Sequence, residues 1–175
     1  FIDNSIFTSS YFGNLFKKDK KKFYLYYNIY IKQISYLLRL LGININTVPN
    51  LDVSRKLSNI IVGTRSFSSN ISHITKIGNL CISKFHDNKI ATVIKHIPGH
   101  GLARVDSHKK LPIITKEKDY LLKKDFKVFQ NKKSLMAMTG HLLFSNIDPL
   151  NNVTHSKKMI KLIRNEIGFK NLIIT

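Results

Sequence analysis

Residues 90–108, IATVIKHIPGHGLARVDSH, join a short β-branched run to a long polar segment, and this stretch decides the fold. The run from Ile90 to Ile94 follows the turn residues Asp87 and Asn88, which is typical of a buried strand in a parallel sheet. The polar residues come directly after it, at the carboxyl end of the strand. Parallel sheets bind ligands at that end, in barrels and in open sheets alike. We therefore predict a parallel α/β fold with a ligand site at the carboxyl end of this strand.

The sequence on both sides repeats the alternation of strand and helix. Apolar residues recur at spacings of three and four in the predicted helices, which are 19–42, 70–85, 116–130 and 156–167. Short apolar runs predict strands at 43–48, 90–94, 135–139 and 172–174. Repeated units of this kind indicate right-handed crossovers and a parallel sheet. Either an open doubly wound sheet or part of a (β/α)8 barrel fits, and there is no glycine motif for dinucleotide binding.

The composition is strongly basic, with a formal net charge of +19. Its 24 Lys, 24 Ile and 16 Asn are in joint excess, as expected from a coding sequence rich in A and T. Most of the Lys residues fall on the polar faces of predicted helices or in connections, where charge ordinarily serves solubility. We therefore expect no nucleic-acid partner, although a basic nucleic-acid-binding protein stays as an alternative.

Length and residue usage favour one folded domain over residues 1–175. A hydrophobic content of 43% is enough to build a core. Cys81 is the single cysteine, so no internal disulfide can form. The residues that start at Phe1 lack the basic and apolar pattern of a leader segment, so we expect none. The apolar stretch 36–41 is interrupted by Arg39 and is far shorter than the ~20 residues of a membrane span. We expect a cytoplasmic protein that does not insert into a membrane.

The polar loop contains candidates for proton transfer. Asp106 and His108 are two residues apart, so the carboxylate can fix the tautomer of the imidazole and favour its charged form. His108 is therefore a candidate general acid or base. Glycines on both sides of His100 suit a mobile loop that covers a substrate. Zinc is the rival use of His96, His100, His108 and Asp106, but neither an HExxH nor a paired-Cys pattern is present, and we expect no metal.

Two further polar residues follow strand ends, and each has an alternative without function. Lys95 follows the strand at 90–94 and could be a cation in solvent. His141 follows the strand at 135–139 and could be a hydrogen-bonded core histidine. Their common place behind strands favours a shared site.

The segment KHIPGHG at 95–101, followed after four residues by DSH at 106–108 and then by LP at 111–112, resembles the hallmark of glycoside hydrolase family 3. The resemblance is to the bacterial β-N-acetylhexosaminidases in particular. Flanking motifs agree in order and cover essentially the whole chain: NLDV at 50–53, GTRSF at 63–67, MTGH at 138–141 with Gly140 in place of alanine, IDP at 147–149 and IGF at 167–169.

The resemblance implies a TIM-like barrel enzyme that removes terminal β-linked N-acetylglucosamine from peptidoglycan fragments during cell-wall recycling, by a retaining mechanism and without a cofactor. It implies that His108 is the acid/base residue and that Asp106 orients it. Substrate binding falls to Arg65, Lys95, His96 and His141. Another family 3 β-glycosidase or phosphorylase is the nearest alternative.

The resemblance also implies that the chain is an internal fragment. In the family, the strand that corresponds to 172–175 runs into the segment that holds the nucleophilic aspartate, so we expect the nucleophile just beyond Thr175. A (β/α)8 barrel typically needs ~250 residues. We therefore expect a partial barrel, incomplete at both ends and inactive by itself, and a monomeric full-length enzyme.

Overall fold

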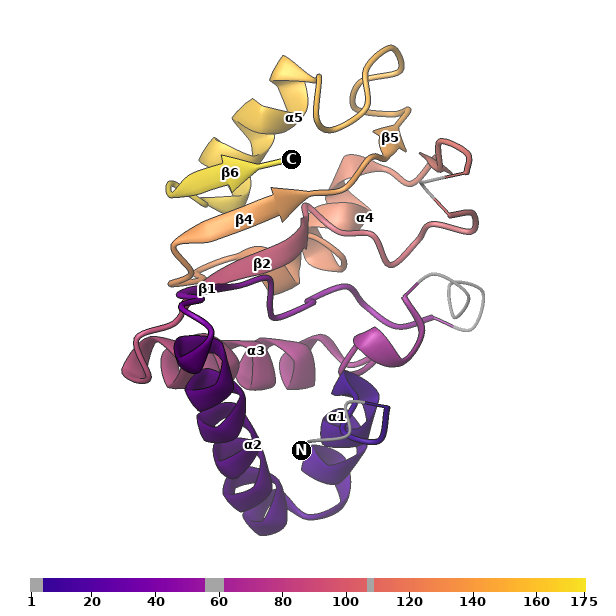
Figure 1. Cartoon of the computed structure of the whole chain (residues 1–175). Coiled ribbons are helices and arrows are strands. Elements are labelled where there is room, and N and C mark those ends of the chain that lie inside the picture. Colours follow the sequence, from indigo (N-terminus) through magenta and orange to yellow (C-terminus); the bar gives the residue numbers. More distant parts are fainter. Residues whose placement is uncertain (1–4, 56–61, 107–108) are drawn as a thin grey trace.

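The computed structural model describes residues 5–55, 62–106 and 109–175, and Figure 1 shows their arrangement. The chain is α/β, and the four strands of its main sheet are parallel throughout, as predicted. Within the described residues, the edge strands of this sheet do not pair with each other, so the sheet is an open arc. Its order is β1 (Ile45–Asn46), β2 (Ala91–Ile97), β4 (Met136–Thr139) and β6 (Leu172–Ile174).

The register gives the sheet one covered and one open face. Partner residues of a parallel ladder point to the same side. Ile94 and its partner Ala137 are fully buried beneath the helices. On the opposite face, Ile45 and Leu172 remain 45% and 60% exposed. The arc therefore has a helix-covered outer face and a largely apolar inner face that is only partly covered.

Three helices form the lower layer in Figure 1, and capping residues set their bounds. They are α1 (Ser9–Lys18), α2 (Lys20–Leu40) and α3 (Ile71–Asp87). The Asp19 carboxylate accepts a hydrogen bond from the backbone N–H of Lys22 at 3.0 Å, and Asn70 caps α3 in the same way. Gly42 adopts φ +72° just after α2, as a C-terminal stop requires. Both predicted helices are confirmed, whereas α1 was not predicted.

In the second half of the chain, one predicted helix is shorter than expected. The helix expected over 116–130 is only α4 (Lys118–Lys123), followed by a 3₁₀ turn, η3 (Lys127–Phe129). The chain leaves the helix because Asp125 is buried and its carboxylate accepts a hydrogen bond from Arg55 at 2.7 Å. This contact lies 70 residues away in sequence, so helix propensity is overridden by tertiary structure.

The remaining elements follow the predicted order with altered bounds. α5 (Lys157–Leu162) continues as a π-helix, η4 (Ile163–Ile167), which ends at Gly168 with φ +82°. The strand expected over 90–94 extends to Ile97, and the one expected over 43–48 shrinks to two residues. Beyond the carboxyl ends of β2 and β4 lies a second parallel pair that was not predicted, β3 (Ile113–Ile114) with β5 (Leu143–Phe144).

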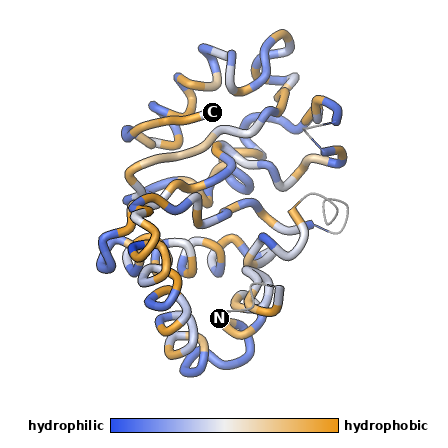
Figure 2. The backbone as a smooth tube through the Cα atoms, in the orientation of Figure 1, coloured by the Kyte–Doolittle hydropathy of each residue, from blue (hydrophilic) through white to orange (hydrophobic). Residues whose placement is uncertain are grey.

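Hydrophobic and hydrophilic residues alternate along the helices (Figure 2), so each helix turns one side to the core. The core includes Phe23 of α2, Ile77 of α3, Phe129 of η3 and Phe126 just before η3, all of them fully buried. None of the described helices is long and apolar enough to cross a membrane.

Candidate active site

A cavity of about 150 Å³ opens where the strands of the main sheet end. Its polar lining residues come from several separate segments: Asp52, Arg65, His96, His100, Asp106, Thr139, His141 and Thr175. Complete small-molecule sites usually enclose ~300–1,000 Å³, so the described residues form part of such a site. Four residues that the sequence assigned to the site, Arg65, His96, Asp106 and His141, are brought together here.

His96 is held at this cavity by a buried carboxylate. Its Nδ1 lies 2.7 Å from Oδ2 of Asp52, which has no exposed side-chain surface. The other carboxylate oxygen, Oδ1, accepts hydrogen bonds from the backbone N–H groups of His100 at 2.7 Å and His96 at 3.3 Å. Burial alone would raise the pKa of Asp52, but these bonds and the nearby histidines outweigh it and lower that pKa. Asp52 is therefore a buried, charged anchor for two histidines.

The sequence around Asp52 explains how it reaches His96, 44 residues away. Asn50 pairs with Lys95 beside the end of β2, and the Leu51 backbone N–H donates to the Lys95 carbonyl at 2.8 Å. The side-chain oxygen of Asn50 accepts from the Asp52 backbone N–H at 2.8 Å, which turns the chain. The Asp52 carboxylate is thereby directed at the end of β2.

The glycine loop after β2 is packed on two sides. A Cβ on Gly101 would overlap the carbonyl oxygen of Val53, and a Cβ on Gly99 would lie 3.1 Å from the Cβ of Asp125. Gly99 also has φ +148°, which other residues rarely adopt. Burial raises the pKa of Asp125 although the Arg55 guanidinium counteracts it. The loop is therefore clamped between the segment at 53–55 and the end of α4.

Lys95 and Arg65 are close enough to influence one another. Lys95 is half-buried, and its Nζ donates a hydrogen bond to Thr47 Oγ1 at 3.4 Å. Burial lowers the pKa of Lys95, and the positive charge of Arg65 lowers it further. Arg65 itself is exposed in a 3₁₀ turn, η2 (Gly63–Arg65). Lys95 does not belong to the lining of the cavity among the described residues, so its predicted role in binding is not tested.

Two further predicted residues, His141 and Asp106, also line the cavity. His141 is exposed, and its Nδ1 lies 3.1 Å from Thr154 Oγ1. Asp106 is half-buried, and its backbone carbonyl accepts from the N–H groups of Lys109 and Lys110, each at 2.9 Å. His108, predicted as the acid/base residue, lies outside the described residues, so its role stays a prediction.

Asp52 and His100 line the site although neither was assigned to it. His100 stood out as a histidine between two glycines, as a rival zinc ligand and as part of the resembling segment KHIPGHG, whereas Asp52 was only part of a resembling motif. Asp52 lies just past the first strand of the sheet, and this common place behind strands is the signal that could have found it. In the part of the chain that the structure describes, no three His, Cys, Asp or Glu residues are grouped so as to hold a metal ion.

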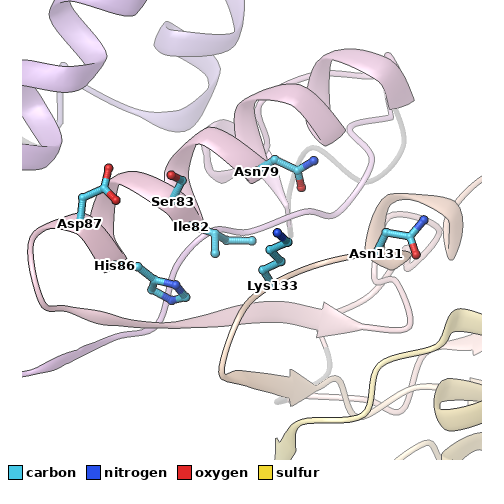
Figure 3. Close-up of a pocket in the computed structure, with 7 residues that line it drawn as sticks. All are labelled: Asn79, Ile82, Ser83, His86, Asp87, Asn131 and Lys133. Atoms are coloured by element: carbon cyan, nitrogen blue, oxygen red, sulfur yellow. The ribbon is translucent and has the colours of Figure 1, made fainter.

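A second cavity, of about 350 Å³, lies at the other end of the strands (Figure 3). It lies between α3 and the connection that leads into β4, and its polar lining includes Asn79, Ser83, His86, Asp87 and Lys133. No residue that the sequence assigned to the site is found there. Ligands of parallel α/β folds bind at the carboxyl ends of strands, so the smaller cavity is the candidate active site.

Comparison with known proteins identifies the family. Residues 26–175 match the model for the glycosyl hydrolase family 3 N terminal domain. This chain belongs to glycosyl hydrolase family 3. Beta-hexosaminidase A from Pseudoalteromonas piscicida is 29% identical over 154 residues, which cover 79% of this chain and 26% of that protein.

Solved structures of family 3 proteins have the same fold. A β-N-acetylglucosaminidase from a Paenibacillus species matches with a TM-score of 0.77 and 30% identity, over 82% of this chain and 28% of that one. NagZ from Neisseria gonorrhoeae matches with a TM-score of 0.86 and 23% identity, over 95% of this chain and 49% of that one. The parallel arc is therefore part of a TIM-like barrel, as predicted. The family 3 chain spans only about a quarter to a half of the length of these relatives.

Proposed function

We propose that the protein is a retaining β-N-acetylhexosaminidase that releases terminal β-linked N-acetylglucosamine from peptidoglycan fragments in the cytoplasm. Relatives with the names beta-hexosaminidase and β-N-acetylglucosaminidase support the reaction class. The observation that carries the proposal is the convergence of Arg65, His96, Asp106 and His141 on one cavity at the carboxyl ends of parallel strands. The cellular role and location rest on the family resemblance.

The chemistry of the cavity suits a polar, uncharged ring. A sugar offers hydroxyl groups that donate and accept hydrogen bonds, and the cavity offers a guanidinium, imidazoles and carboxylates to meet them. Orienting the ring precisely is itself a large part of catalysis. In this proposal His108 transfers the proton to the leaving oxygen, Asp106 orients His108, and an aspartate beyond Thr175 forms the glycosyl-enzyme.

The proposal is tested on the product of the complete reading frame with two chromogenic substrates, the aryl β-N-acetylglucosaminide and the aryl β-glucoside. We expect kcat/KM to favour the N-acetyl sugar, and Arg65→Ala to lower kcat/KM by about 10- to 100-fold, because a hydrogen bond to a charged group is worth about 1.5–3 kcal/mol. Arg39→Ala, on the exposed surface of α2, is the control and should change nothing. Preference for the glucoside, or equal losses in the two variants, would overturn the proposal.

A further inference from the structure

The carboxylate of Asp52 divides its two oxygens between two tasks. Oδ1 accepts from the backbone N–H groups of His96 and His100, which tie the chain after β2 to the segment at 50–53. Oδ2 faces only the Nδ1 of the His96 ring, at 2.7 Å, among the contacts of the described residues. One oxygen therefore anchors backbone, and the other meets a side chain that lines the cavity.

The contact with Oδ2 determines where His96 carries its proton. An ionised carboxylate accepts hydrogen bonds and cannot donate them. Asp52 is fully buried and held in its charged form by its hydrogen bonds, so the Nδ1 atom of His96 must be the donor. A neutral imidazole has one proton, which leaves Nε2 bare. His96 retains 19% exposure at the cavity, and Nε2 is the ring nitrogen left to face it.

We propose that Asp52 is a positioning residue that fixes His96 in the Nδ1-protonated tautomer, so that Nε2 accepts a hydrogen bond from a hydroxyl group of the bound sugar. The sugar hydroxyl rests on the proposed function, whereas the tautomer rests on the geometry of Asp52 alone. The carboxylate acts on the ligand through His96, because its own side chain has no exposed surface.

The two tasks of Asp52 can be separated by a single substitution. In Asp52→Asn, the amide oxygen is expected to take the place of Oδ1, because the opposite orientation would leave two backbone N–H groups facing an NH₂ group. The amide NH₂ then faces His96 and can only donate. Nδ1 must accept, and the ring proton moves to Nε2. The two backbone hydrogen bonds to the side chain of residue 52 remain, whereas the ring nitrogen that faces the cavity changes from an acceptor to a donor.

The test is the protonation state of the His96 ring nitrogens in the product of the complete reading frame, read by long-range ¹H–¹⁵N NMR across a pH series that extends until the neutral ring is observed. We expect Nδ1–H in the natural chain and Nε2–H in Asp52→Asn. Asp148→Asn is the matched control: this carboxylate is also buried but accepts from Ser156, and the His96 tautomer should stay unchanged. The amide spectrum shows whether each variant is folded.

A proton on Nε2 of neutral His96 in the natural chain would overturn the proposal. This measurement needs no variant and therefore tests the proposal even if Asp52→Asn does not fold. An unchanged Nδ1–H tautomer in a folded Asp52→Asn would overturn it as well. In the active protein, Asp52→Asn should lower kcat/KM for the N-acetylglucosaminide by about 10- to 100-fold, as expected for a mismatched hydrogen bond. Failure of the sugar assignment would appear in substrate preference and would leave the NMR result intact.

Discussion

At the amino end of β2 the buried polar groups bond to one another. Thr92 Oγ1 lies 2.9 Å from Ser134 Oγ and 3.1 Å from His86 Nε2, and the Ser134 hydroxyl is 2.6 Å from the Thr92 carbonyl. At the carboxyl end, Nδ1 of His100 and Oδ1 of Asp125 are buried without a hydrogen-bond partner among the described residues. The buried polar groups at the amino end of β2 therefore satisfy one another, and we call them the closed network. The groups at the carboxyl end that lack a partner among the described residues are the open network.

The difference shows which end is built for stability. A buried polar atom without a partner costs about 1–3 kcal/mol and is uncommon in native proteins. Asn50 adds a third such atom at the carboxyl end, its Nδ2. Sites that bind ligands keep groups of this kind at the expense of stability. Of these three residues, His100 lines the cavity of the candidate active site, whereas the closed network supports the base of the sheet.

The largest loss of stability is expected from Gly101→Ala, which breaks the carboxyl end. A Cβ there would overlap backbone atoms of Val53, which cannot move as a side-chain tip could. We expect the free energy of unfolding to fall by about 3 kcal/mol, measured by urea denaturation. Gly42→Ala is the control: φ is +72° and nothing lies within 4 Å of the added Cβ, so only about 1 kcal/mol should be lost. Equal losses would mean that the loop has room to spare.

Ser134→Ala opens the closed network at the amino end. The substitution removes the hydroxyl that lies between Thr92 Oγ1 and the Thr92 carbonyl and leaves Thr92 poorly paired in a buried place. We expect a loss of about 2 kcal/mol in the same assay. Ser145→Ala is the comparison, because the hydroxyl of Ser145 is half-buried and its bonds are long, at 3.4 Å, so the loss should stay under about 0.5 kcal/mol. If the two variants behaved alike, the amino-end network would not contribute to stability.

The smallest change is expected from His100→Leu at the open end. The side chain is only 4% exposed, yet its Nδ1 has no hydrogen-bond partner to lose within the described part of the chain. Replacing an unpaired polar group with an apolar one offsets the loss of packing, so the free energy of unfolding should change by less than about 1 kcal/mol. A loss larger than that of Ser134→Ala would contradict the contrast between the two ends of β2.

The same variant changes the response to acid. Burial lowers the pKa of His100 below its ordinary value, so below about pH 6.5 the unfolded chain binds a proton that the folded chain resists. Stability should therefore fall as the pH drops from 7 to 5, and less so in His100→Leu. The decline does not vanish, because burial lowers the pKa of His86 too. Urea midpoints at pH 7, 6 and 5 measure the two slopes, and parallel slopes would mean that His100 titrates normally.

Sequence predicted best what neighbouring residues determine. Asp19, Gly42 and Asn70 mark helix ends through contacts within one turn, and the structure has those ends where the pattern indicates. The shortened α4 was not predictable, because Asp125 leaves the helix for a partner 70 residues earlier. The two-residue strands β3 and β5 are too short to show any periodicity.

The candidate site shows the same difference between what local sequence determines and what contacts between distant segments determine. Polar residues that follow strands predicted a cluster at the carboxyl ends, and His96 and His141 do line one cavity there. Arg65, which was assigned through the family resemblance, lines the same cavity. The link between Asp52 and His96 depends on β1 and β2 lying side by side, and only the assembled sheet shows that. His100 belongs to the resembling segment KHIPGHG, but its place at the cavity is shown only by the assembled structure.

The parallel order of the sheet also determines which elements can form first during folding. Neighbouring strands of the arc are separated by roughly forty residues, and non-local pairing of this kind forms slowly, whereas helices form from local contacts. A ribosome adds about 5–20 residues per second, so β6 emerges roughly ten seconds after α2. During synthesis the amino-terminal helices therefore form first, and the edge of β4 stays unpaired until β6 has been made.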